Sequence, residues 1–188
     1  MKNNTILGVL TLLSIVLLFL IKPSETNQPY QSSSKKPQEY MMQLFVTLFN
    51  ESGAVKNKLS ANYWGYLPEK GISTLTRPHL TLFKPDGVQW FIHSKKGHVT
   101  QPNIGIIETI TLQENVILER PASDLATAVT VETESLSYQP KKDFAESDDF
   151  VRLIKPGVTI TGIGLRAPLD KGSVELLSHV KTYYLIDH

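Results

Sequence analysis

The chain has 188 residues, a length that suits one domain of ordinary size with an appended segment. It contains no cysteine, which excludes disulfide bonds, zinc–thiolate sites and thiol nucleophiles. Nineteen Lys and Arg residues against eighteen Asp and Glu residues give a formal charge of +1, without a long block of like charge, and this excludes the basic footprint of a nucleic-acid-binding protein.

The N-terminal part of the chain is apolar. From Thr5 to Ile21 there are 17 residues without a charge, framed by Lys2 and Lys22, and most of them are Leu, Ile, Val or Phe. As a helix this segment spans about 25 Å, which is short for a hydrocarbon core of about 30 Å, but lysines at both ends can reach the headgroups. A cleaved signal peptide is the alternative, although no A-x-A-like cleavage site follows. We expect a single transmembrane helix at residues 1–22.

Residues 23–39 form a polar segment of different composition. It contains three prolines and a run of three serines, and it shows no hydrophobic periodicity. Sequences of this kind form extended linkers. We therefore expect residues 23–39 to hold a following domain away from the membrane.

From residue 40 onward the chain consists of short stretches in which apolar and polar residues alternate. Examples are residues 42–48, 110–118, 129–133 and 158–162. A period of two predicts strands, so residues 40–188 predict an all-β domain, built as an antiparallel sandwich, a barrel or a jelly roll. Its first and last strands would expose unpaired backbone groups, which either recruit other strands or are blunted by charges and bulges.

The clearest hairpin is LTLFKPDGVQWFI at residues 80–92. Leu80 and Leu82 flank Thr81 on one arm, Trp90 and Ile92 interleave with Gln89 and Phe91 on the other, and Pro-Asp-Gly supplies the turn. One face of this hairpin is apolar and must be covered. Alternation alone leaves open whether the cover is the rest of the core or a ligand.

Motifs for catalysis or metal binding are not evident in the sequence. The five histidines show no recognisable ligand spacing, and Glu132 and Glu134 lie two apart, as on a solvated strand face. No glycine-rich phosphate loop precedes a helix. We expect no catalytic residue, no metal and no cofactor.

Several stretches, in this order, resemble the LptC family of the lipopolysaccharide export bridge of Gram-negative bacteria, and the resemblance covers nearly the whole chain. They are E-S-G-A at 51–54, R-P-H-L-T-L-F at 77–83, W-F-I-H-S-K-K-G at 90–97, L-Q-E-N-V-I-L at 112–118, V-E-T-E-S-L-S-Y-Q-P at 131–140, A-E-S-D-D-F-V at 145–151, G-I-G-L-R-A-P-L at 162–169 and L-L-S-H-V-K-T-Y-Y at 176–184. The chain departs from the family pattern at Glu114, where a glycine is frequent, and at Asn57, where an aromatic residue is frequent. Both departures concern local turn geometry.

The resemblance implies a twisted β-jelly roll whose two sheets enclose an apolar groove for the acyl chains of lipopolysaccharide. It implies an inner-membrane protein with a cytoplasmic N-terminus and a periplasmic β domain at 40–188. It also implies partners, namely the ATP-driven transporter complex of LptB, LptF and LptG in the membrane and the bridge protein LptA in the periplasm. No enzymatic activity of its own is implied.

The expected site residues fall into three groups. The candidates for lining the groove, with Leu44 and Leu75 first because the family's lipid-contacting strands fall there, are Leu44, Val46, Leu75, Leu80, Leu82, Trp90 and Ile92. The candidates for adding a strand to LptA are Thr182, Tyr183, Tyr184 and Leu185. The candidate structural glycines, expected at turns or bulges with positive φ, are Gly53 and Gly164.

Two other functions remain open from the sequence. One is a membrane-tethered adaptor whose interior is a closed core. The other is a tethered hydrolase of envelope glycans, which would need Asp148 or Asp149 to cluster with a histidine in one pocket.

Overall fold

Alternation of apolar and polar residues produces strands along most of the chain. The structure, a computed structural model, describes residues 39–100 and 107–185. The predicted transmembrane helix at 1–22, and all of the predicted linker except its last residue, lie outside the described residues. In the described part, no helix has the length and apolar character that a membrane crossing requires.

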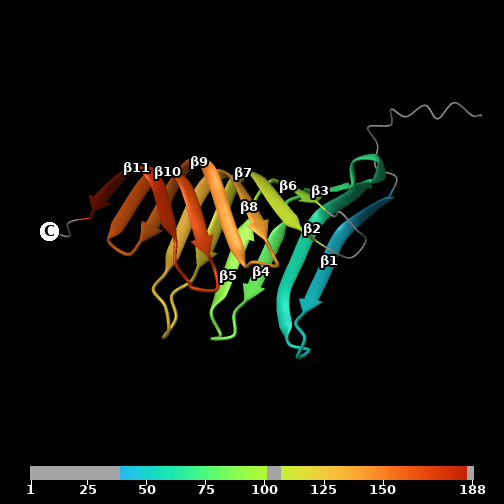
Figure 1. The fold of residues 1–188 in the computed structure, drawn as a ribbon, viewed down its shortest axis with the longest axis horizontal. Helices are drawn as coiled ribbons and strands as arrows, with labels where there is room; N and C mark the ends of the chain where they lie inside the picture. Colours follow the sequence, from blue (N-terminus) through green and yellow to red (C-terminus); the bar gives the residue numbers. More distant parts are fainter. Residues whose placement is uncertain (1–38, 101–106, 186–188) are drawn as a thin grey trace, which may run out of the picture. The chain divides into compact units, whose positions relative to one another are not determined.

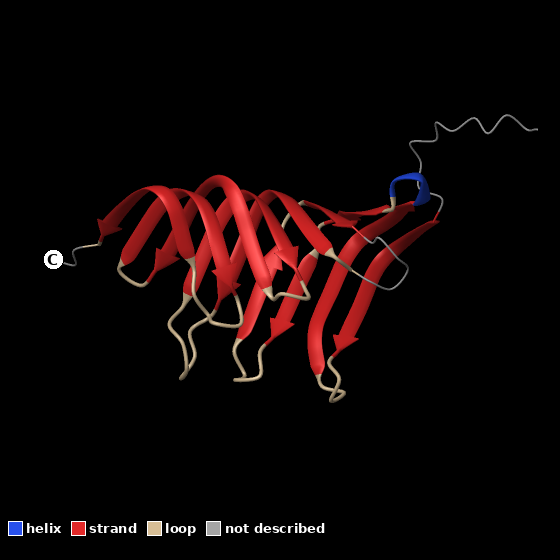
Figure 2. Ribbon diagram, viewed as in Figure 1, coloured by secondary structure: helices blue, strands red, loops and turns tan. Residues whose placement is uncertain are grey.

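Eleven strands and one 3-10 turn, η1 (Pro68–Lys70), make up the described fold (Figure 2). The strands are β1 (Glu39–Phe49), β2 (Val55–Leu67), β3 (Ile72–Thr76), β4 (His79–Phe83), β5 (Gln89–His93), β6 (Lys96–Thr100), β7 (Thr109–Arg120), β8 (Val129–Gln139), β9 (Phe144–Lys155), β10 (Val158–Pro168) and β11 (Glu175–Tyr184). The prediction of an all-β antiparallel domain is confirmed.

All eleven strands belong to one hydrogen-bonded antiparallel sheet. β1 pairs with β2 at one end, and β11 pairs with β10 at the other. Figure 1 shows β1 and β11 at opposite ends of the row of strands. Each of these two strands therefore has one backbone edge without a partner among the described residues.

The two layers of the domain arise by bending this sheet. Residues 63–67 of β2 pair with β3, whereas residues 57–60 of the same strand pair with β4. In the same way β7 pairs with β6 through residues 109–113 and with β5 through residues 117–119. The long strands thus run through both layers, which we call the β3 layer and the β4 layer. Figure 2 shows the long strands arching from one layer to the other.

The bend, here called the crease, lies where the long strands pass from one layer to the other. Ladder irregularities occur there in β7, β8 and β10. Residues with positive φ also gather there, namely Gln43, Arg77, Glu114, Asn115, Gly164 and His179. Bulges and left-handed residues both kink a strand, so they allow one sheet to fold on itself.

The core lies between the two layers and is formed by the inward residues of the alternating pattern. Every strand from β1 to β10 contributes at least one buried apolar side chain to it. Burial of each Leu, Ile or Val side chain stabilises the fold by about 1.5–3 kcal/mol. The family resemblance implied two sheets around the interior, whereas in the structure the two layers are halves of one hydrogen-bonded sheet, because the long strands bend instead of ending.

Candidate functional site: the apolar interior and the two edge strands

The interior is a continuous apolar row that runs from β1 to β11. Of the predicted groove residues, Leu75 and Leu80 are each 2% exposed, and Leu82, Trp90 and Ile92 are fully buried. Leu44 is 8% exposed, and Val46 is half-buried against the core. At the other end Leu176 of β11 packs partly against the same cluster.

The hairpin of β4 and β5 positions four of these residues. Leu82 pairs across the strands with Trp90, and Leu80 pairs with Ile92. The turn is closed by the Lys84 N–H, which donates to the Val88 carbonyl at 2.9 Å, and the Asp86 side chain accepts from the Val88 N–H at 3.0 Å. The predicted hairpin is confirmed, and in this structure other core side chains cover its apolar face.

Leu75 lies on the opposite layer. Its register partners are Trp64 on β2 and Gly97 on β6. A Cβ atom added at Gly97 would lie 3.1 Å from Pro78 Cγ and 3.3 Å from Leu112 Cδ2. The glycine therefore permits close packing beside Leu75, a role that the sequence analysis did not assign.

Two polar atoms in the interior have no partner among the described residues. They are the indole Nε1 of Trp90 and the hydroxyl of Ser73, which is 1% exposed. A buried donor without an acceptor costs about 1–3 kcal/mol. These atoms are candidates for contact with a polar group of a bound molecule.

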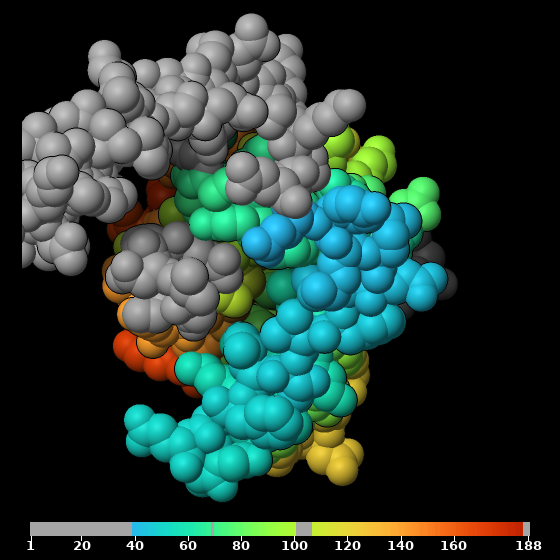
Figure 3. Space-filling model, turned by 90° about the vertical axis from the view of Figure 1, so that its right-hand side faces the viewer, coloured from blue at the N-terminus to red at the C-terminus, as the bar shows by residue number. Residues whose placement is uncertain are grey.

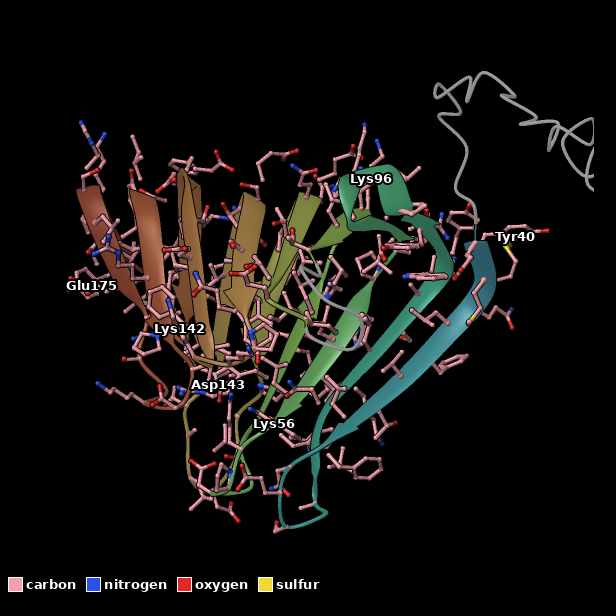
Figure 4. All side chains as sticks on the ribbon, turned by 45° about the vertical axis from the view of Figure 1, so that its right-hand side comes forward. Tyr40, Lys56, Lys96, Lys142, Asp143 and Glu175 are labelled. Atoms are coloured by element: carbon pink, nitrogen blue, oxygen red, sulfur yellow. The ribbon has the colours of Figure 1, made fainter. Side chains whose placement is uncertain are left out.

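The layers meet on the side opposite the crease, along a line that we call the seam. It comprises the turns at 84–88, 140–143 and 169–172 together with Lys56 and Arg120. Lys84 Nζ lies 2.5 Å from Asp143 Oδ2 and joins the β4 layer to the β3 layer. Figure 4 shows Lys56 and Asp143 in the lower part of the fold, with Lys96 at its upper margin.

The seam is otherwise held by bonds to carbonyl oxygens. Arg120 Nη1 donates to the Gly172 carbonyl at 3.0 Å, and Lys56 Nζ donates to the Pro140 carbonyl at 3.4 Å. The Arg120 guanidinium also lies over the Trp90 ring, 5.1 Å from its centre. Sequence reasoning missed these residues. A signal was present, because Lys84 and Arg120 each lie two residues after an inward leucine, Leu82 and Leu118, and so face the same side of the sheet.

Burial shifts the pKa values of two seam groups. It lowers the pKa of Lys84, against the opposing effect of the Asp143 carboxylate. It raises the pKa of Tyr138, and the charge of Asp143 adds to that shift. The Tyr138 hydroxyl donates to Asp143 Oδ1 at 3.0 Å, so Asp143 accepts from groups of both layers.

The predicted partner strand, β11, exposes apolar side chains at its end. Tyr183 is 54% exposed, and Tyr184 and Leu185 are 73% and 74% exposed. The Leu185 N–H donates to the Gly157 carbonyl at 3.0 Å. Because bonding to a neighbouring antiparallel strand alternates along the chain, Tyr183 also bonds towards β10, whereas the N–H groups of Thr182 and Tyr184 point to the unpaired edge.

The first strand, β1, forms the surface at the other end of the domain. Figure 3 views this end, where β1 is the outermost strand. Its exposed apolar side chains include Tyr40 at 69% and Phe45 at 80%. Both edge strands therefore combine unpaired backbone groups with apolar side chains, which is typical of edges that pair with other strands.

The two predicted structural glycines both have positive φ, 82° at Gly53 and 79° at Gly164. Gly53 lies in the turn between β1 and β2, where a Cβ atom would meet no neighbour within 4 Å. Gly164 lies on β10 at the crease, where a Cβ atom would lie 2.9 Å from Leu177 Cδ1 of β11.

The acidic residues considered for catalysis lie at the crease. A hollow of about 830 Å³ there is lined by Asp149 together with Glu132, Glu134 and Arg152, and no histidine lines it. Asp149 accepts a hydrogen bond from the Ser135 hydroxyl at 2.5 Å. Among the described residues, no group of three His, Cys, Asp or Glu side chains has the arrangement of a metal site.

Comparison with known proteins places these features in one family. The family model described as "Lipopolysaccharide-assembly, LptC-related" matches residues 7–185. The lipopolysaccharide export system proteins LptC of Escherichia coli (strain K12) and Shigella flexneri are each 25% identical over 146 residues, which covers 75% of this chain and 71% of theirs. The crystal structure of LptH, the LptA-homologous periplasmic component of the lipopolysaccharide transport device of Pseudomonas aeruginosa, has a similar fold, with a TM-score of 0.54 at 10% identity over 69% of this chain and 95% of that one.

Proposed function

The chain belongs to the LptC family and takes part in lipopolysaccharide transport, and from this premise we propose that its apolar interior receives the acyl chains of lipopolysaccharide and passes them towards the periplasmic bridge. The observation that carries the proposal is the row of inward apolar residues from Leu44 on β1 to Leu176 on β11. A row that reaches both edge strands gives an acyl chain a path through the domain. An interior closed at its ends would not.

The physical need for such a path is large. An acyl chain of about 12–14 carbons costs on the order of 10 kcal/mol to expose to water. A chain that moves from one apolar surface to another avoids most of this cost, so transfer through the domain needs little energy of its own. The energy for extracting the lipid from the membrane then comes from the transporter. The protein itself catalyses no reaction in this proposal.

We place the partners at the two ends of the sheet. β11, with Thr182, Tyr183, Tyr184 and Leu185, would add its free edge to a strand of LptA. The membrane complex of LptB, LptF and LptG would stand at the other end. In this arrangement residues 1–22 anchor the chain in the inner membrane with the N-terminus in the cytoplasm, and residues 40–188 lie in the periplasm.

A second candidate function is an adaptor that joins these partners around a closed core. It is favoured by the full burial of Leu82 and Trp90, which leaves their side chains covered by other parts of the domain. The two functions differ in whether the layers separate to admit lipid. The adaptor would bind its partners and leave lipopolysaccharide unbound.

Site-specific photo-crosslinking separates the two candidates. A photoreactive amino acid at Leu75, which faces the interior, should crosslink lipopolysaccharide in cells that carry the complete transport system. The same group at Thr74 is the matched control, because Thr74 is the preceding residue of β3 and faces the opposite side of the sheet. Equal labelling at both positions would favour the adaptor, and strong labelling at Leu75 alone would favour the conduit.

A further inference from the structure

The seam carries positive charge directly above the apolar interior. Lys84 directly follows β4 and continues the inward positions of Leu80 and Leu82, and its side chain is only 5% exposed. Arg120 follows Leu118 in the same way on β7, and Lys56 is near enough to Lys84 to affect its titration. An apolar interior with a cationic rim is complementary to a molecule that has acyl chains below an anionic headgroup.

The positive charge is only partly neutralised within the described residues. Lys84 pairs with Asp143, and Asp170 also lies near it, whereas Arg120 and Lys56 donate hydrogen bonds to backbone carbonyls at the seam. A carbonyl carries no net charge, so these two cations can gain from an anionic ligand. Phosphate groups are well suited, since they accept several charge-assisted hydrogen bonds.

The bend of the sheet determines where a headgroup could leave the interior. Seven strands, β1, β2 and β7 to β11, run through the crease, and only two residues separate β3 from β4 and β5 from β6, so backbone closes this side of the described sheet. Between its two ends the interior can open only along the seam, where side chains and turns meet without a strand ladder. A bound amphiphile with chains inside and a polar group outside would therefore place that group at the seam.

The unpaired Trp90 Nε1–H is a second observation that points to a ligand. Trp90 is fully buried, its ring lies under the Arg120 guanidinium, and its N–H has no acceptor among the described residues. Ester and amide carbonyls join the acyl chains of a lipid to its phosphorylated headgroup. Such a carbonyl would satisfy this donor at a level just below the phosphate.

We propose that the seam is a phosphate-binding site for an acylated phospholipid or phosphoglycolipid headgroup: when the layers separate, Lys84 leaves Asp143 and, with Arg120 and Lys56, binds the phosphate. Asp143 then competes with the ligand for Lys84 and keeps the empty interior closed. This inference rests on the proposed function, because it presumes that acyl chains enter the interior. The lowered pKa of Lys84 supports it, since an ammonium group held in a buried pair gains solvation on opening.

The test uses the full-length chain in detergent with a photoreactive residue at Leu75. Two probes are compared, diphosphoryl lipid A and the same lipid after enzymatic removal of its phosphates. Lys84→Gln should reduce crosslinking of the diphosphoryl lipid roughly tenfold, since one charge-assisted bond is lost, and should leave the dephosphorylated lipid unchanged. Asp143→Asn should increase crosslinking of the diphosphoryl lipid, because the competing carboxylate is neutral.

Three controls make the result specific. Lys96→Gln removes one positive charge from the exposed pair with Glu114 on the other margin of the fold and should change neither probe. Lys84→Arg keeps the charge and should retain binding of the phosphorylated lipid if Lys84→Gln proves poorly folded. Inorganic phosphate should compete only weakly, because it lacks the acyl chains.

Each outcome has one meaning. If Lys84→Gln and Asp143→Asn lower crosslinking alike, or if both lipids respond equally to Lys84→Gln, the ion pair is structural and the phosphate site is wrong. A third outcome is that inorganic phosphate reduces crosslinking although the protein crosslinks both lipids equally well. This would indicate a site for free phosphate and also overturn the proposal. If the protein with an unchanged seam and the photoreactive residue at Leu75 crosslinks neither lipid, the proposed function itself fails.

Discussion

His79 and His93 stand opposite each other on β4 and β5, with ring centres 5.8 Å apart and ring planes 12° from parallel. Burial, followed by the charge of His93, lowers the pKa of His79 below its ordinary value of 6.5, while Glu119 opposes the shift. A lowered pKa means that the unfolded chain binds the proton more readily than the folded one. The contribution of His79 to stability is therefore fully present above pH 6.5 and decreases as the pH falls below this value.

We expect the melting temperature of the β domain in the full-length chain to fall between about pH 7.5 and about pH 5.5. His79→Gln should weaken this dependence, because the replacement does not titrate. His179→Gln on exposed β11 is the control and should keep the dependence of the unchanged chain. If the melting temperature of His79→Gln depends on pH as it does in the unchanged chain, the histidine pair is not the cause of the dependence.

Gly164 and Gly53 allow backbone strain to be separated from a steric clash. Both have positive φ, so alanine at either position costs about 1–2 kcal/mol in the left-handed region. At Gly164 the new Cβ would also meet Leu177 on β11, which should add about 1–3 kcal/mol. Urea unfolding should therefore show a greater loss of stability for Gly164→Ala than for Gly53→Ala, and equal losses would contradict the contact with β11.

The free edge of β11 can be blocked without disturbing its pairing to β10. The N–H of Thr182 points to the unpaired edge, so Thr182→Pro removes a donor that the fold does not use. We expect this variant to melt near the unchanged chain and to lose capture of LptA in a pull-down. Thr182→Val is the control that keeps the N–H and should retain capture.

Tyr183→Pro is the matched contrast on the same strand. Its N–H bonds towards β10, so proline there should lower the melting temperature as well as the capture of LptA. If Thr182→Pro captures LptA normally while Tyr183→Pro does not, the partner would be held by something other than added strand pairing.

The interior should contribute strongly to stability even when no lipid is bound. Leu82 is fully buried against Trp90, so Leu82→Ala should reduce the free energy of unfolding by about 2–5 kcal/mol through lost burial and the cavity left behind. Leu125 is 71% exposed, and Leu125→Ala should change it by less than about 0.5 kcal/mol. A small effect at Leu82, measured by urea unfolding, would mean that the interior is loosely packed.

The hairpin at 79–93 could be predicted from the sequence in detail because its signals are local. A period of two assigned Leu80, Leu82, Trp90 and Ile92 to one face, and the Pro-Asp-Gly turn set the register of the two arms. The structure buries these four side chains on that face. The alternation could not predict what covers them, because a neighbouring layer of the sheet and an acyl chain both pack against an apolar face of this kind.

Lys84 and Asp143 illustrate the part that could not be predicted. Lys84 follows an alternating strand and Asp143 lies in a turn far away in the sequence. No sequence pattern around either residue predicts that the two are in contact. They meet because positive φ at residues such as Arg77 and Asn115 bends the sheet along the crease and brings the far ends of the two layers together.

The sequence by itself determined that this protein is built from strands and which face of each strand is apolar, since the chain geometry gives neighbouring side chains opposite directions. Only the tertiary structure decided that one sheet supplies both layers and that a cationic seam closes them. The bend depends on the combined geometry of many strands, and contacts across it join residues that local patterns cannot relate.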